Sequence, residues 1–280
     1  MSGKIAVIGG SGLYQIDGVT KVKEHNIETP FGKTSGAIAE CLVGETECFF
    51  LPRHGETHSI LPHEVNYRAN IYALKSLGVK YILSISAVGS LTQGLAPRRL
   101  FLPDQFIDWT KGKRERTFFG EGVIAHVSVA EPIDQKFHNV LKEQCSKLGL
   151  DFEAGGSYVC IEGPQFSSKA ESEMYRSFGA KVIGMTNVPE SYLAKEAGIA
   201  YATVAMVTDY DCWKEEHCTV EEIMKVMKDN NLTANKLIRE FIPHLSNHKF
   251  EFDHELKKGL MTPVESLSGE KQEWVKTLLH

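Results

Sequence analysis

The sequence predicts a single α/β domain built on a mixed or largely parallel β-sheet. Apolar segments with strand character alternate with helical segments through most of the 280 residues, an order that is typical of α/β folds. The chain is long enough to bury a full core, and no repeat or low-complexity linker divides it. We therefore expect one domain over residues 1–280, with a core at about 4–243 and a C-terminal tail and helix at 244–280.

Short apolar runs bounded by turn residues mark the expected strands. They are placed at residues 4–8, 36–43, 46–52, 81–87, 100–107, 123–129, 156–161, 181–185 and 199–207. Longer segments with helical periodicity predict helices at 64–78, 134–148, 168–178, 187–197 and 219–242, and a last helix that ends at His280. Asp134 fits an N-cap, and Ser168 with Glu171 has the form of a capping box.

Two segments between these elements have no regular pattern. Residues 111–116 form a charged loop that is a candidate cover for a site. Residues 244–269 are polar and irregular, and we expect them to be ordinary surface.

Composition excludes several classes of function. The formal net charge of −5 argues against a large nucleic-acid interface, and no apolar run approaches the roughly 20 residues that span a bilayer. The six cysteines form no CxxC pair and no zinc-ligand spacing with histidine, so no metal site is expected. The chain opens directly with a strand instead of a signal sequence, which together with this cysteine usage predicts a cytoplasmic protein.

Three turns that follow predicted strands carry groups suited to an anion. Gly9-Gly10-Ser11-Gly12 lets the backbone approach an anion and adds a hydroxyl donor. It is neither a dinucleotide-binding turn, because Gln15 replaces the third glycine, nor a P-loop, because no Gly-Lys-Ser/Thr follows. Arg53 and His54 follow a second strand, and the serine- and glycine-rich segment 84–91 includes a third turn.

These three turns are expected to converge on one anion at one edge of the sheet. Arg53 offers a planar fork for two-point contact with phosphate. The simpler interpretations are a tight glycine turn without a ligand and, for Arg53, a salt bridge at the surface.

Two later turns carry groups suited to a flat base and a sugar. Phe166 can stack on a base with Ser167 beside it. Met185 can lie under a sugar ring, and Thr186 can bind phosphate at the start of the predicted helix at 187–197. The simpler interpretation of Met185 is packing in the core.

Asp209 and Asp211 follow the buried strand at 199–207. Residues two apart in a strand point to the same face, so the two side chains leave the strand together if its geometry continues. Close carboxylates push each other's pKa upward, which suits one of them to proton transfer. The alternative is a solvated turn that caps the next helix.

Taken together, these motifs resemble the trimeric purine nucleoside phosphorylase family. The matching segments span about residues 4–225 and are 8–13, 29–32, 53–55, 66–70, 130–132, 162–166, 187–190 and 209–213. The resemblance implies a single α/β domain around a twisted mixed sheet that is partly closed into a barrel and flanked by helices. It also implies a homotrimer or a dimer of trimers, no metal or organic cofactor, and inorganic phosphate as co-substrate.

The resemblance further implies a role for each matching residue. Phosphate is expected to contact Ser11, Arg53, His54, Ser86, Ala87 and Thr186. Met185 is expected beside the ribose, and the base is expected to be surrounded by Phe166, Ser167, Asp209 and Asp211. The 5′-substituent is expected near His126, Val220 and Ile223, with His126 lent by a neighbouring subunit.

The identity of the base follows from hydrogen-bonding chemistry. A carboxylate accepts from the 6-amino group of adenine and repels the 6-oxo group of a 6-oxopurine. Where 6-oxopurine relatives have a glutamate and an asparagine, this chain has Ser167 and Asp209, and Val220 stands where they bind a 5′-hydroxyl with a histidine. An apolar residue there suits a methylthio group.

The resulting expectation is phosphate-dependent cleavage of 5′-methylthioadenosine to adenine and 5-methylthioribose 1-phosphate, a salvage reaction. Asp209 is the candidate general acid, and Asp211 is the candidate partner of the 6-amino group. The alternatives are a phosphorylase of 6-oxopurine nucleosides or methylthioinosine, a hydrolytic nucleosidase, and a non-enzymatic nucleotide-binding module. The last leaves Arg53, Thr186 and Asp209 without a role.

Overall fold

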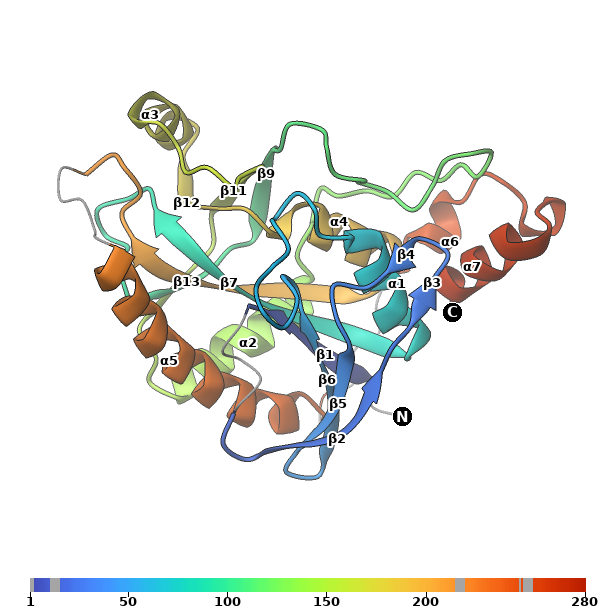
Figure 1. Cartoon of the computed structure of the whole chain (residues 1–280), viewed down its shortest axis with the longest axis horizontal. Helices are drawn as coiled ribbons and strands as arrows, with labels where there is room; N and C mark the ends of the chain where they lie inside the picture. The colour runs from blue at the N-terminus through green and yellow to red at the C-terminus, as the bar shows by residue number, and fades with distance from the viewer. Residues whose placement is uncertain (1–2, 11–15, 215–219, 247, 249–253) are drawn as a thin grey trace.

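A computed structural model describes residues 3–10, 16–214, 220–246, 248 and 254–280 of the chain. Its strands are β1 (Lys4–Gly9), β2 (Val19–His25), β3 (Glu28–Thr29), β4 (Gly32–Lys33), β5 (Ile38–Val43), β6 (Thr46–Pro52), β7 (Val79–Ser90), β8 (Leu100–Leu102), β9 (Gln105–Trp109), β10 (Phe152–Ala154), β11 (Ser157–Ile161), β12 (Ala180–Gly184) and β13 (Ala200–Asp209). Its helices are α1 (Tyr67–Ser76), α2 (Gln135–Lys147), α3 (Lys169–Ser177), α4 (Asn187–Glu196), α5 (Val220–Ser246), α6 (Leu256–Gly259), the 3-10 helix η1 (Val264–Ser266) and α7 (Gly269–Leu279). The alternating order confirms the predicted α/β class (Figure 1).

Eleven of these strands form one branched sheet. Its main path is β10-β8-β13-β7-β1-β6-β5-β2, and the central strands β13, β7, β1 and β6 are parallel to one another. The carboxyl end of β7 also pairs with β12, from which β11 and β9 continue as a branch. Among the described residues no ladder joins the outer strands β2, β9 and β10, so the expected partial closure into a barrel is not established by the strand pairing.

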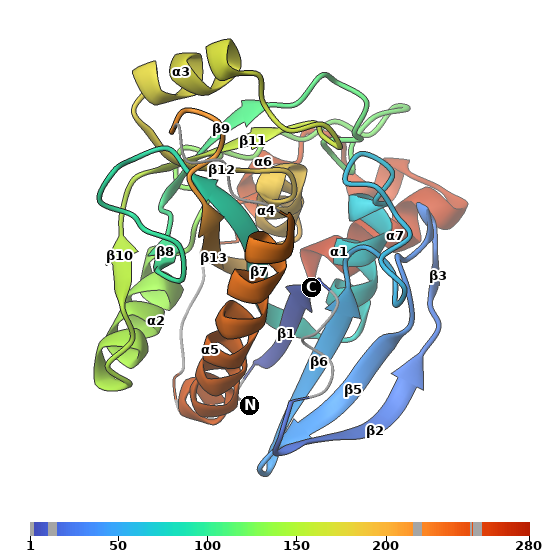
Figure 2. The ribbon, with the colours of Figure 1, turned by 60° about the vertical axis from the view of Figure 1, so that its left-hand side comes forward.

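Alternating side chains of the central strands face two separate cores. On β1, Ile5 and Val7 join a core closed by α2 and α5, whereas Ala6 and Ile8 join a core closed by α1, α4 and α7. Figure 2 shows α5 lying along one face of the sheet. Helices α1 and α7 belong to the core on the other face of the central strands. Because both faces are covered, the central strands have continuous apolar sequences. In the described part of the chain, no helix has the length and apolar character needed to cross a membrane.

The predicted strand at 123–129 is wrong. Val123 and Ala125 form only isolated bridges, Ala125 with Leu260 of the tail, and Ile124 and Val129 are exposed. The segment has the alternating apolar pattern of a strand, but no described strand runs beside it to form a ladder. The segment instead makes loop contacts with the tail, such as the backbone bond from Met261 to Ile124.

Other elements differ from the prediction in extent. The expected strand at 100–107 is divided into β8 and β9, and β2, β10 and the short β3 and β4 were not predicted. Most side chains of β2 are exposed, since it is an edge strand that pairs with β5 alone. Such a strand lacks the apolar face by which strands are found in a sequence. The remaining predicted strands and helices form within a few residues of their expected bounds.

The segment 244–269, expected to be ordinary surface, is anchored to the core at Leu256, and the last helix after it also packs on the core. Leu256 is fully buried, and Trp274, Val275 and Leu278 join the core closed by α1 and α4. The ring of His254 lies against Gly198, and its Nε2 lies 2.9 Å from the carbonyl oxygen of Leu278. The tail therefore contributes to the same core as the central strands.

We expect His254 to make the protein less stable as the pH falls from 6.5 to 4. Burial, aided by the charge of Lys75, lowers the pKa of His254 to about 4. Below pH 6.5 the unfolded chain takes up a proton that the folded protein does not, so folding loses stability until about pH 4. Urea unfolding between pH 4 and 7 should show that wild type loses more stability than His254→Gln, which keeps a donor for Leu278. Parallel pH profiles for the two proteins would contradict this.

Candidate active site

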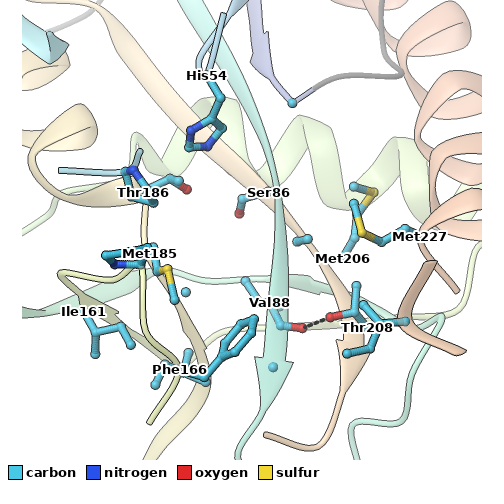
Figure 3. A pocket seen from close by; sticks show the side chains of 18 of the residues that line it. His54, Ser86, Val88, Ile161, Phe166, Met185, Thr186, Met206, Thr208 and Met227 are labelled. Atoms are coloured by element: carbon cyan, nitrogen blue, oxygen red, sulfur yellow. Dashed lines mark hydrogen bonds between the residues drawn. The ribbon is translucent and has the colours of Figure 1, made fainter. Parts of the chain in front are cut away.

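A cavity of about 410 Å³ lies along the carboxyl-terminal halves of β7 and β13. Figure 3 shows Ser86 and Val88 on β7, with His54 and Thr186 to one side of that strand and Met206 and Met227 to the other. Predicted site residues that line the cavity are Arg53, His54, Ser86, Ala87, Phe166, Ser167, Met185, Thr186, Asp209, Asp211 and Ile223. The structure thus brings together segments that are far apart in the sequence, but residues 84–90 continue strand β7 instead of forming the predicted turn.

The remaining predicted residues are placed elsewhere or are not described. His126 is exposed and does not line the cavity. Ser11 and the side chain of Val220 lie outside the described residues. Lining residues that were not predicted include His58, Ile60, Leu61, Pro62, Met206, Thr208, Met227 and Asn231. Met227 and Asn231 follow Ile223 at intervals of four residues, which places all three on one face of α5. This spacing could have predicted them from the sequence.

Two hydroxyl groups face the part of the cavity where phosphate was predicted. The Ser86 hydroxyl donates to Oδ1 of Asn187 at 3.2 Å. The Thr186 hydroxyl is buried and makes no hydrogen bond with any described residue. Thr186 occupies the N-cap position of α4 but does not cap it. A buried hydroxyl without a partner is costly, so this group is ready to donate to a ligand.

His54 lies beside these hydroxyls as a neutral ring. Burial and the nearby charge of Arg53 lower the pKa of His54 to about 4. Its Nδ1 lies 2.9 Å from the carbonyl oxygen of Ile60, which can only accept, so Nδ1 carries the proton. The other ring nitrogen, Nε2, is then an acceptor, able to receive a hydrogen bond from a protonated phosphate oxygen.

Arg53 is held in a buried salt bridge. Its Nε and Nη2 donate to the two carboxylate oxygens of Glu190 at 2.6 and 2.9 Å. Further bonds from the guanidinium reach Ser84 Oγ and the carbonyl oxygens of Ile8 and Ile85. The salt bridge considered from the sequence is therefore present, but in the interior instead of at the surface. The two-point face of Arg53 is occupied by Glu190, and a contact of Arg53 with phosphate stays a prediction.

Asp209 and Asp211 meet at the other part of the cavity through a turn. Strand β13 ends at Asp209, and Asp211 has a left-handed backbone with φ of 51°, so strand geometry does not continue as expected. Asp209 accepts from the Asp211 backbone N–H at 2.7 Å and from the Thr208 hydroxyl at 2.6 Å. Burial, with a contribution from the charge of Asp209, raises the pKa of Asp211.

Phe166 and Ser167 lie beside the two aspartates. Phe166 is 80% exposed at the edge of the cavity, so the face of its ring is accessible to a flat ligand. The Ser167 hydroxyl is buried without a hydrogen bond among the described residues. The Cys212 thiol donates to the Ser167 carbonyl oxygen at 3.2 Å, which links this segment to the aspartate turn.

The charged loop at 111–116 is anchored by Arg114, whose side chain is fully buried. Its guanidinium donates to the Glu162 carboxylate at 2.7 Å and to the carbonyl oxygens of Ile161, Glu162 and Val188. It therefore ties the segment before Phe166 to the start of α4, next to Thr186. One buried cation thus holds together two cavity-lining segments that are distant in sequence.

The cavity combines two kinds of chemistry. Near Thr186, Ser86 and His54 it offers hydroxyl and backbone groups suited to a phosphate-sized anion. Near Asp209 and Asp211 it offers carboxylate oxygens that accept hydrogen bonds or, when protonated, donate one. The cavity therefore suits an anion in the first region and, next to it, a neutral group with N–H donors in the second region.

Comparisons with known proteins agree with this geometry. The family model of the phosphorylase superfamily matches residues 4–243. The chain is 46% identical to the S-methyl-5′-thioadenosine phosphorylase of Thermosynechococcus vestitus, with 100% of this chain and 99% of that protein covered. It is 49% identical to that of Hyperthermus butylicus over 86% of this chain and 88% of the relative.

Solved structures give the same result. A methylthioadenosine phosphorylase from an antarctic soil metagenomic library superimposes with a TM-score of 0.94 and 44% identity, covering 100% of this chain and 99% of that one. The methylthioadenosine phosphorylase of Schistosoma mansoni in complex with adenine gives a TM-score of 0.83 and 36% identity, covering 88% and 93%. From its sequence and its structure alike, the chain belongs to the phosphorylase superfamily.

Proposed function

We propose that this protein cleaves 5′-methylthioadenosine with inorganic phosphate and releases adenine and 5-methylthioribose 1-phosphate. It would thus be a pentosyltransferase of purine and methionine salvage. The observation that carries the proposal is the placement of an unpartnered Thr186 hydroxyl and the carboxylates of Asp209 and Asp211 in one cavity. The names and activities of its relatives support the same substrate.

The proposed reaction replaces one bond at C1′ of the ribose by another. The C1′–N9 bond lengthens, and its electron pair moves to the purine, which leaves positive charge on the ribose. Phosphate held below C1′ by Thr186, Ser86, the Ala87 backbone, His54, Arg53 and Ser11 stabilises that charge and then forms the new C–O bond. Asp209 protonates N7 of the purine, so that the base leaves as a neutral molecule.

The preference for adenine over a 6-oxopurine would depend on a hydrogen-bond acceptor beside position 6 of the base. Asp211 would accept a hydrogen bond from the 6-amino group of adenine, while Phe166 stacks on the ring and Ser167 lies beside it. Met185 would lie under the ribose. A phosphorylase of 6-oxopurine nucleosides or methylthioinosine is the second candidate, because a raised pKa allows Asp211 to donate when protonated.

The 5′-substituent would lie against α5. Ile223 and Met227 on α5 and Met206 on β13 give the cavity an apolar wall, and a methylthio group gains free energy by burial there. Val220 and His126 are proposed to complete this region, His126 from a neighbouring subunit. His126 is exposed and outside its own cavity, as a residue with that role would be.

The assembly and the setting of the enzyme are also proposed. We infer a homotrimer or a dimer of trimers that acts in the cytoplasm, with phosphate as co-substrate and without a metal or organic cofactor. Light scattering with size-exclusion chromatography tests the assembly, and activity after exhaustive chelation tests independence from metal. A monomer with full activity would contradict the role proposed for His126.

Base release from three nucleosides tests the proposed function. Methylthioadenosine, adenosine and inosine are each incubated with and without phosphate. We expect adenine release that requires phosphate and is fastest from methylthioadenosine. Faster release of hypoxanthine from inosine would favour the second candidate, and release without phosphate would indicate a hydrolase.

A further inference from the structure

The Thr186 hydroxyl differs from that of Ser86, the other hydroxyl among the described residues that was predicted to contact phosphate. Ser86 already directs its proton to Asn187, and Asn187 is itself fixed by Ser84 and Thr203 at 3.0 and 2.8 Å. Thr186 has no such partner among the described residues. Of these two hydroxyls, Thr186 is therefore the one whose proton is free for a ligand.

The start of α4 explains why Thr186 does not use its hydroxyl as a cap. A threonine at the N-cap normally accepts from the backbone N–H two or three residues later. Here those residues are Val188, which has a non-helical backbone, and Pro189, which has no N–H. The sequence thus removes the usual capping partners and leaves the Thr186 hydroxyl for another role.

Tyr158 lies directly behind this region. It is on β11 and has no exposed surface, and its hydroxyl makes no hydrogen bond with any described residue. A Cβ atom on Gly184 would overlap that hydroxyl and lie 2.6 Å from Cζ of the ring. The glycine two residues before Thr186 therefore provides the space that admits the Tyr158 hydroxyl next to the cavity wall.

The Tyr158 and Thr186 groups act on each other. Burial raises the pKa of Tyr158, so its hydroxyl keeps its proton, while the hydroxyl and backbone N–H of Thr186 oppose that rise. Neither hydroxyl oxygen makes a hydrogen bond with a described residue. The Tyr158 hydroxyl lies against Gly184, and Gly184 and Thr186 both line the cavity, so Tyr158 and Thr186 belong to one part of the cavity wall.

We propose that Tyr158 is a positioning residue for phosphate, which orients the Thr186 hydroxyl as a donor. When phosphate is bound, the Tyr158 O–H donates to Thr186 Oγ1, and the Thr186 proton points into the cavity. Bonds in such a chain strengthen one another, and the alignment tightens when phosphate accepts from Thr186. The proposal rests on the proposed function only in taking phosphate as the anion bound there.

Tyr158→Phe tests this because it removes only the oxygen. We expect the KM for phosphate to rise by about tenfold, the loss of one modest hydrogen bond. The KM for methylthioadenosine and the kcat at saturating phosphate should change by less than about twofold. If the hydroxyl were only structural, removal of an unpartnered buried oxygen would leave the KM for phosphate unchanged and the unfolding temperature equal or higher.

A double-mutant cycle tests whether Tyr158 affects phosphate binding through the Thr186 hydroxyl. In a Thr186→Val background, Tyr158→Phe should cause no further rise in the KM for phosphate, since the hydroxyl that it orients is gone. Tyr81→Phe is the matched control, because Tyr81 is also buried but packs on Phe137 in the other core. An unchanged KM in Tyr158→Phe, or additive effects in the double variant, would overturn the proposal.

Protection by inorganic phosphate alone provides a measurement without turnover. Phosphate should raise the unfolding temperature of wild type and Tyr81→Phe, and should raise that of Tyr158→Phe clearly less at the same concentration. Because no nucleoside is added, this comparison does not depend on which nucleoside the enzyme cleaves. If wild type is not protected and needs no phosphate for turnover, the proposed function fails. If wild type and Tyr158→Phe are protected equally, the positioning role fails.

Discussion

Asp209→Asn is expected to bind nucleoside and phosphate but to lose about 10²- to 10⁴-fold in kcat, the usual range for removal of a general acid. The amide has nearly the shape of the carboxyl group, so the cavity should keep its form. Asparagine cannot supply the proton that N7 of the leaving purine requires. The kcat and KM for methylthioadenosine at saturating phosphate provide the measurement.

The matched control for this experiment is Asp211→Asn. Both aspartates line the cavity. Asp209 accepts from Thr208 and from the Asp211 backbone, and burial raises the pKa of Asp211. If Asp211 only binds the 6-amino group, its variant should affect the KM for the nucleoside more than kcat. The opposite pattern, with Asp209→Asn at full turnover and Asp211→Asn inactive, would exchange the two roles.

The sequence was sufficient to predict where the site lies, because the site depends on strand order. Arg53 follows β6 and Ser86 lies in the carboxyl-terminal half of β7, and because both strands are parallel to β1 these parts lie at one edge of the sheet. Thr186 follows β12, which is antiparallel to β7, so this rule did not place it. The local signals for these turns are short: apolar runs followed by glycine, hydroxyl residues or charge. The structure places all three residues at one cavity.

Partners that come from distant segments were not predictable in the same way. Glu190 is 137 residues from Arg53, and Arg114 reaches the Val188 carbonyl from a loop that looks like charged surface. No periodicity or spacing encodes such pairs. The same holds for the tail, where Leu256 is an apolar side chain buried in the core although the stretch around it is mostly polar.

Glu190→Gln is expected to lower the free energy of unfolding by about 3–5 kcal/mol, the usual cost of breaking a buried ion pair. Arg53 and Glu190 are each 1% exposed. Glu190 also accepts from Ser84 and Tyr201 at 2.9 and 2.8 Å. Glutamine keeps the shape but not the charge, which leaves the Arg53 cation buried without compensation. Urea unfolding at pH 7 measures the difference.

Glu255→Gln is the control for this variant, because the Lys195–Glu255 pair is partly exposed and should contribute no more than about 1 kcal/mol. Glu190→Gln, compared with wild type, also tests whether the charge of Arg53 acts on phosphate. If its charge reaches the anion, loss of Glu190 strengthens that attraction, and phosphate should raise the unfolding temperature of Glu190→Gln more than that of wild type. Equal shifts in the two proteins would assign Arg53 to the framework behind the cavity, and Thr186 would then be the main side-chain donor to phosphate.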